Sequence, residues 1–159
     1  MRLFIPLCAA LLLLTSAVTS AQENFDEKFG KMISDDAARE SIKLALTKVH
    51  TTVCASKKPC APTNASELAN PPITIVDGRA AMVFAIKSAL AQWCDIDWKR
   101  SFLPMIAFGK HKMKMNDRQL QLITLIHGDF QARQFATYAK AGQCPATLRA
   151  QLDSQLPKL

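Results

Sequence analysis

The pattern of apolar and polar positions divides the chain into a short apolar start and a helical remainder. Arg2 precedes an apolar run over residues 3–14, and small or polar residues follow it to Ala21. A run of about a dozen apolar residues is too short for a membrane span, which needs about 20, and it has the form of an export signal. We therefore predict a signal peptide over residues 1–21 and a single domain over residues 22–159.

From Ser34 onward, apolar residues recur at the three- and four-residue spacing of amphipathic helices. Ser34, Asp35 and Asp36 supply capping oxygens at the start of a first helix, which the pattern carries to about Cys54. Four apolar residues share one face of this helix: Ile42, Leu46, Val49 and Val53.

A second helix is predicted from Asp77, as its capping residue, through Cys94. It is apolar on nearly every side, which is typical of the central element of a bundle. A third helix follows the capping residue Asp97, and we expect Pro104 either to bend it or to divide it into two pieces.

The longest predicted helix begins at Asn116, with Gln119 three residues later as in a capping box, and runs to about Ala141. Gly142 then stands where a left-handed end cap is expected. A last helix follows Pro145. Because no alternating strand pattern intervenes, we predict an all-α fold, a compact bundle of four to six helices held by disulfides.

A proline-rich stretch, residues 55–72, separates the first two helices. Its four prolines stand among Ser, Thr and Asn, so the composition predicts a loop. A connection of nearly twenty residues is unusual in a compact domain and indicates either a function or a staple that orders it. Cys60 is the candidate for that staple.

Export would place four cysteines, Cys54, Cys60, Cys94 and Cys144, where thiols oxidise. The sequence alone allows more than one pairing. If successive helices run antiparallel, the ends of the second and fourth major helices lie on the same side, which favours Cys94–Cys144 and leaves Cys54–Cys60. No Cys-x-x-Cys pair occurs, so the spacing favours structural disulfides over zinc binding or thioredoxin-type chemistry.

The chain is basic, with 20 Lys and Arg against 13 Asp and Glu and a formal net charge of +7. Such an excess favours contact with an anionic surface, although it can also serve only to keep a protein soluble. Positive residues gather in the middle of the chain, with aromatic residues beside them. We predict an interaction patch there, formed by Trp98, Lys99, Arg100, Lys110, His111, Lys112, Lys114 and Arg118.

Signals for chemistry are weak. His127 lies on the apolar face of the longest predicted helix, where it could act as an acid or base with Asp95 or Asp129, but a histidine there is more often a core residue. His111 stands near two methionines that would suit copper, among lysines that would repel it. No nucleophile elbow, phosphate loop or metalloprotease motif occurs, so we predict no catalytic residue, no metal and no cofactor.

Four short motifs lie in the middle of the chain: QWCDIDW over residues 92–98, FLPM over 102–105, DRQ over 117–119 and LIHG over 125–128. With these motifs, residues 77–128 resemble small exported all-helical proteins of alphaproteobacteria that have no assigned activity. The resemblance implies an exported bacterial protein and carries no functional residues over to this chain.

These features predict an exported, non-enzymatic binding protein of the bacterial envelope, such as an inhibitor, an immunity-type protein or an adaptor, in the periplasm or secreted. Its expected partner is a protein or an anionic envelope surface, including peripheral contact with a membrane, and not a nucleic acid. One alternative is a secreted effector that acts on host membranes or proteins, which would make the chain a virulence candidate. A second is a small periplasmic hydrolase that uses His127. The oligomeric state stays open.

Overall fold

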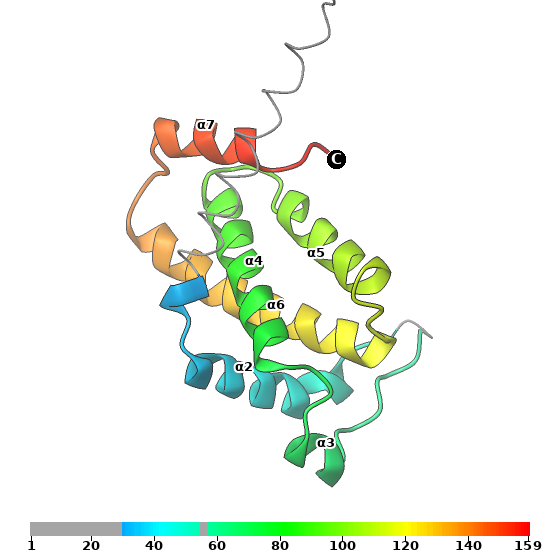
Figure 1. Cartoon of the computed structure of the whole chain (residues 1–159). Helices are drawn as coiled ribbons and strands as arrows, with labels where there is room; N and C mark the ends of the chain where they lie inside the picture. Colours follow the sequence, from blue (N-terminus) through cyan, green and yellow to red (C-terminus); the bar gives the residue numbers. More distant parts are fainter. Residues whose placement is uncertain (1–29, 55–56) are drawn as a thin grey trace, which may run out of the picture. The chain divides into compact units, whose positions relative to one another are not determined.

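A computed structural model of the chain describes residues 30–54 and 57–159 (Figure 1). The predicted signal peptide, residues 1–21, lies outside the described residues. The compact unit Ile33–Leu159 contains the helices that follow.

The predicted all-α fold is confirmed. The described part of the chain contains no β-strand and only one isolated bridge, between Val53 and Pro59. A single turn of 3-10 helix, Val49–Thr51, follows the first of its helices. The α-helices of the unit are α2 (Asp35–Lys48), α3 (Ala65–Ala69), α4 (Ile75–Trp93), α5 (Lys99–His111), α6 (Asp117–Lys140) and α7 (Ala146–Gln155).

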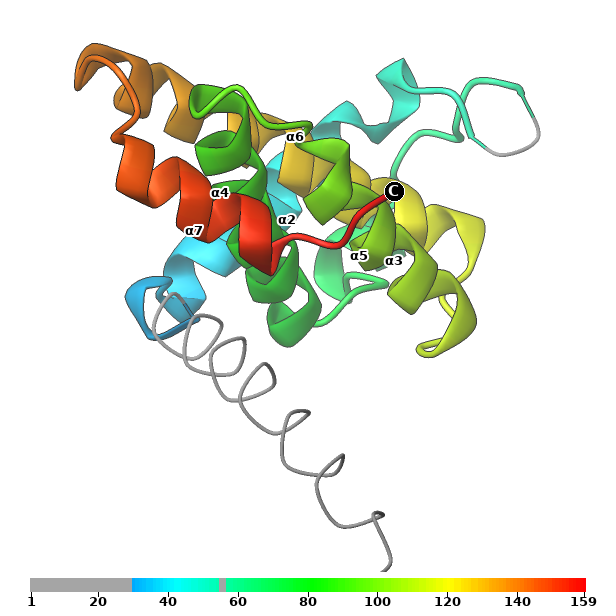
Figure 2. The ribbon, with the colours of Figure 1, turned by 90° about the horizontal axis from the view of Figure 1, so that it is seen from above.

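Helix α4 is the centre of the bundle, as its apolar sequence predicts. It packs against α2, α5, α6 and α7, and the two views show these neighbours around it (Figures 1 and 2). Two glycines permit close approach of the outer helices. A Cβ atom at Gly78 would lie 3.0 Å from Ile42 Cδ1 on α2, and one at Gly109 would lie 3.1 Å from Leu120 Cδ2 on α6.

Capping residues set the ends of the main helices. Asn116 and Gln119 form the predicted capping box at the start of α6, and Gly142 has the left-handed φ of +96° expected after its end. At α4 the prediction of the cap is wrong by one turn. Thr74 is the N-cap, and Asp77 is the third helical residue, whose carboxylate accepts hydrogen bonds from Thr74 in a second capping box.

The first predicted helix ends earlier than its apolar pattern suggests. Helix α2 stops at Lys48 and not near Cys54, and Val53 is exposed. The hydroxyl groups of Thr51 and Thr52 donate hydrogen bonds to the carbonyl oxygens of Lys48 and Val49 (both 2.7 Å). These local bonds compete with the helical ladder and end the helix.

The predicted loop, residues 55–72, is not free of regular structure. It contains α3, which a capping box between Asn64 and Glu67 begins. The carboxylate of Glu67 also accepts hydrogen bonds from Arg118 on α6, so a tertiary contact supports this short helix. Pro104, in contrast, does not divide its helix, because α5 continues through it.

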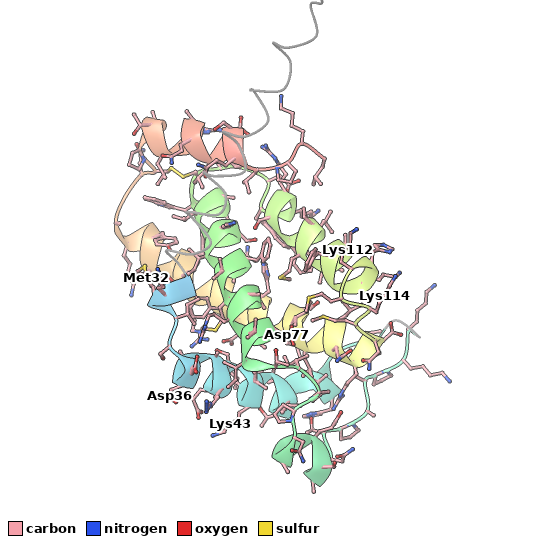
Figure 3. The ribbon with its side chains drawn as sticks, viewed as in Figure 1. Met32, Asp36, Lys43, Asp77, Lys112 and Lys114 are labelled. Carbon is pink, nitrogen blue, oxygen red and sulfur yellow. A yellow bond between two sulfur atoms is a disulfide. The ribbon has the colours of Figure 1, made fainter. Side chains whose placement is uncertain are left out.

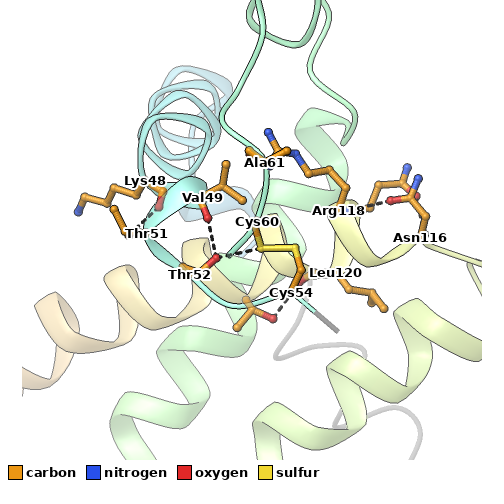
Figure 4. Close-up of a disulfide and its surroundings, with 12 residues drawn as sticks. Lys48, Val49, Thr51, Thr52, Cys54, Cys60, Ala61, Asn116, Arg118 and Leu120 are labelled. Carbon is orange, nitrogen blue, oxygen red and sulfur yellow. Dashed lines mark hydrogen bonds between the residues drawn. A yellow bond between two sulfur atoms is a disulfide. The ribbon is translucent and has the colours of Figure 1, made fainter. Parts of the chain in front are cut away.

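Both disulfides have the pairing that the antiparallel helix order predicts. Cys54 and Cys60 close the short loop after the 3-10 turn, with Cα atoms 5.1 Å apart (Figure 4). Cys94 at the end of α4 bonds to Cys144 before α7, with Cα atoms 5.0 Å apart. The long bridge therefore attaches α7 to the centre of the bundle.

Candidate binding surface

Helix α5 lies against α4 and α6 with one face and exposes the other. Ser101, Met105 and Gly109 are buried and spaced by four residues, which defines the inward face. Phe108, on the flank, keeps 57% of its surface exposed although it is a large aromatic residue. Leu103 on the outward face is exposed as well. The outer side of α5 thus combines exposed apolar residues with the cations of the predicted patch.

At the C-terminal end of α5, four residues of the predicted patch lie together. We call Lys110, His111, Lys112 and Lys114 the basic tip. All four are exposed, and Figure 3 places Lys112 and Lys114 on the outer side of the turn between α5 and α6. Among the described residues, no carboxylate forms an ion pair with any of them. Met113, within the same turn, is 49% exposed.

The backbone holds the basic tip in place. The amides of Lys112 and Met113 both donate to the carbonyl oxygen of Phe108 (2.9 and 3.1 Å), and the amide of Met115 donates to that of Gly109 (3.0 Å). Met115 packs inward against Gly109. Cations in the last turn also interact favourably with the negative end of the helix dipole. The dipole accounts for Lys110 and His111, but Lys114 lies beyond the helix and has no such role.

Arg100, at the other end of the same helix, does not belong to a binding surface. Its guanidinium pairs with the carboxylate of Asp153 and donates to the carbonyl oxygens of Asp153, Leu156 and Pro157, the last three at 2.9, 2.7 and 2.8 Å. Only 13% of the side chain is exposed. Arg100 therefore fastens the C-terminal segment to α5 and offers no charge to a partner.

Arg118 is likewise engaged within the fold. Its guanidinium donates to both carboxylate oxygens of Glu67 (3.0 and 2.7 Å) and to the carbonyl oxygen of Ala61 (2.6 Å), near the Cys54–Cys60 bridge (Figure 4). These hydrogen bonds from Arg118 hold the pKa of Glu67 below its ordinary value. With 18% of the side chain exposed, Arg118 stabilises the loop that contains α3.

Trp98 and Lys99 lie at the N-terminal end of α5, about 18 Å from the end of the helix at the rise of an α-helix. Trp98 packs against Phe102, with ring centroids 5.6 Å apart, and is half-buried. Lys99 is exposed, at the opposite end of α5 from the basic tip. The predicted patch of eight residues is thus split: the structure brings four of them together in the basic tip and places the other four elsewhere.

His127 is a core residue in this structure. Its side chain is 1% exposed, and Nε2 lies 2.9 Å from the hydroxyl oxygen of Ser88 on α4, which is also buried. The Phe102 ring covers it, with centroids 4.9 Å apart. Burial lowers the pKa of His127 to about 4, so the imidazole is neutral near pH 7. Neither Ser88 nor this pairing was predicted, because the two residues are 39 positions apart.

The structure does not bring His127 together with the acids considered as its partners. Asp129 lies on the surface, where its carboxylate pairs with Lys48 (3.2 Å) and Arg133 (2.8 Å). Asp95 is almost fully exposed beside Arg149 (3.6 Å). Because Ser88 and His127 are both buried, no substrate reaches the pair in this arrangement.

Two other concave regions carry no excess of positive charge. A cavity of about 250 Å³ between α2 and α6 has Leu44 and Leu125 in its lining, and Lys48 and Asp129 pair with each other at its edge. Another, of about 450 Å³, has Asp95, Asp97 and Asp153 in its lining. There Arg100 pairs with Asp153 and Arg149 with Asp95, and Asp97 forms no ion pair among the described residues. Neither region therefore has the positive charge of the predicted patch.

The described residues contain no group of three or more His, Cys, Asp or Glu placed to hold a metal ion. The two methionines beside His111 also diverge, since Met115 packs inward and Met113 faces solvent. In the same part of the chain, no helix has the length and apolarity to cross a bilayer.

The fold and the surface define a disulfide-linked all-α protein whose basic tip forms no ion pair with the described carboxylates. Comparison with protein-family models, with curated proteins and with solved structures finds no match. The similarity to exported alphaproteobacterial proteins therefore stays a prediction. The two disulfides fit an extracellular or periplasmic compartment, where thiols oxidise.

Proposed function

We propose that this is an exported, non-enzymatic binding protein of the bacterial envelope, which docks on an anionic partner through the basic tip. One observation carries the proposal. The lysines of the basic tip have no acidic partner within the described chain. Arg100 and Arg118, which were predicted as part of the same patch, instead form ion pairs within the fold. A cluster of unpaired cations raises the local positive potential and attracts an anionic surface.

Exposed apolar residues beside the cations support binding over mere solubility. A patch that only keeps a protein soluble needs charge, and Phe108 and Met113 would work against that role. Charge together with aromatic and methionine side chains is typical of surfaces that first attract a partner and then exclude water from the contact. The buried state of His127 supports a binding function over hydrolysis.

The test is selective retention of envelope material. The exported protein is immobilised and exposed to an envelope fraction of an expressing bacterium, and the retained proteins and lipids are identified by mass spectrometry. We expect a component that the wild type retains and that the K110E/K112E/K114E variant loses, with an unchanged helical circular-dichroism spectrum.

A matched control has the same change of charge elsewhere. Arg39, Lys43 and Lys140 are exposed cations on α2 and α6, and the triple charge reversal R39E/K43E/K140E should retain the same component. Equal retention by the tip variant and the wild type would refute the proposed function.

A further inference from the structure

The identity of the cations narrows the class of the partner. Five of the six arginines that the structure describes form ion pairs within the chain: Arg79, Arg100, Arg118, Arg133 and Arg149. The basic tip contains no arginine and three lysines. Protein interfaces are enriched in Arg and depleted of Lys, because the planar guanidinium forms bidentate pairs with carboxylates. Lysine instead keeps its ammonium group in water while its alkyl chain covers apolar material.

The shape of the surface also limits the class of partner that can bind. Phe108 and Met113 project from a helix end and the turn that follows it, and neither lines the cavities between α2 and α6 or beside α7. Protein partners bind most strongly where an anchor side chain fills a pocket. Isolated apolar side chains that project beside lysines suit a boundary that can flow around them, as the headgroup region of a bilayer does.

The backbone conformation at Lys114 shapes the turn of the basic tip. Lys114 has a left-handed φ of 55°, a conformation in which Gly or Asn is favoured over lysine. The conformation directs the chain around the turn in which Lys112 and Lys114 lie on the same outer side (Figure 3).

We propose that the partner of the basic tip is the surface of a bilayer containing anionic phospholipids. This inference rests on the proposed function and names its partner. Lys110, Lys112 and Lys114 contact the lipid phosphates, and Phe108 and Met113 enter the boundary between headgroups and acyl chains. Three lysines near an anionic surface together strengthen binding by about a hundredfold. The contact is peripheral and reversible, because two apolar side chains bury little area.

The experiment is vesicle flotation with the exported protein, purified from the periplasmic fraction, whose N-terminus is determined by intact mass. Vesicles are made of phosphatidylcholine alone or of phosphatidylcholine mixed with phosphatidylglycerol. We expect flotation only with the anionic vesicles, decreasing as salt is added. The K110Q/K112Q/K114Q variant should bind at least about tenfold more weakly, and the R39Q/K43Q/K140Q control should bind within about twofold of the wild type.

A second measurement tests entry of the apolar side chains. In the F108W variant, anionic vesicles should shift tryptophan emission to shorter wavelength, beyond any change in the wild type, which retains Trp93 and Trp98. No shift would overturn the proposed insertion of residue 108 into the bilayer.

Two outcomes would overturn the membrane proposal. One is absence of flotation with anionic vesicles. The other is an equal loss of vesicle binding in K110Q/K112Q/K114Q and in the R39Q/K43Q/K140Q control, which would show that binding depends only on the net charge of the protein. If the wild type fails to float with anionic vesicles but still retains an envelope protein that K110E/K112E/K114E loses, the partner is a protein and the proposed binding function stands. If neither vesicle flotation nor the retention of an envelope component depends on the basic tip, both the membrane proposal and the proposed binding function fail.

Discussion

The two ends of α5 both carry positive charge and use it in opposite ways. At the N-terminal end, the guanidinium of Arg100 forms hydrogen bonds to Asp153 and to Leu156 after α7. At the C-terminal end, the lysines of the basic tip face solvent, and no carboxylate in the described part of the chain pairs with them. The comparison shows that a net charge of +7 says little about binding until it is known which cations form ion pairs within the fold.

Chemistry explains why arginine and lysine are distributed in this way. Arg100 satisfies three carbonyl oxygens and a carboxylate with one planar group, which a lysine ammonium could not reach together. A lysine at the basic tip stays hydrated and mobile at little cost. Variants at the two ends of α5 should therefore alter different properties of the protein.

The largest effect is expected from the Cys94–Cys144 bridge, which joins the end of α4 to the start of α7. In the chain-entropy model, removing a bridge with a sequence separation of 50 costs about 4 kcal/mol, and one with a separation of 6 costs about 2 kcal/mol. Denaturant unfolding of C94A/C144A and C54A/C60A measures both values. A larger loss in C54A/C60A would show that the short loop, and not the attachment of α7, dominates stability.

The next largest effect is expected in the pH dependence of the unfolding free energy, through the buried His127. His127 has a pKa of about 4 when folded and 6.5 in its ordinary state, so the unfolded chain binds the proton more readily. Its contribution to stability is complete above about pH 6.5 and is lost as the pH falls towards 4, by about 3 kcal/mol in total.

Unfolding free energies measured across this pH range test the assignment to His127. The H127Q variant should lack this part of the pH dependence. Identical pH profiles for H127Q and the wild type would show that His127 is not the group responsible.

A somewhat smaller loss is expected at Arg100. The R100Q variant removes the donor to the carbonyl oxygens of Leu156 and Pro157, which are in part reached by water, so the expected cost is about 1 to 2 kcal/mol. Thermal and denaturant unfolding provide the measurement, and K99Q, the exposed neighbour, should stay within about 0.5 kcal/mol of the wild type. Equal stability of R100Q and K99Q would contradict the structural role of Arg100.

The smallest effect on stability is expected at the other end of the helix. Because the lysines of the basic tip form no ion pair in the described chain, K110Q/K112Q/K114Q should change the unfolding free energy by no more than about 0.5 kcal/mol. Denaturant unfolding checks this value. A loss comparable to that of R100Q would mean that the tip stabilises the fold.

Local signals in the sequence were sufficient for much of the fold. Asn116 with Gln119 predicted the start of α6, Gly142 predicted its end, and antiparallel helices predicted the cysteine pairing. The errors arose where another local interaction prevailed. Threonine hydroxyls shortened α2, and a capping box at Asn64 begins α3 within the predicted loop.

The surface could be predicted only in part, because ion pairing is not local. Arg100 and Arg118 are basic residues like Lys112 in the sequence, and their acidic partners lie about fifty positions away. Ser88 and His127 meet only because α4 and α6 pack together. The cluster of lysines at residues 110, 112 and 114 was identifiable, because these residues lie close together in the sequence.

One crossed measurement tests the contrast between the two ends of α5 most directly. The unfolding free energy and the binding to anionic vesicles are determined for both R100Q and K110Q/K112Q/K114Q, at a temperature where both are folded. We expect R100Q to lose stability and keep vesicle binding, and the tip variant to keep stability and lose binding. Loss of the same property in both variants would contradict the separation of structural arginine from binding lysine.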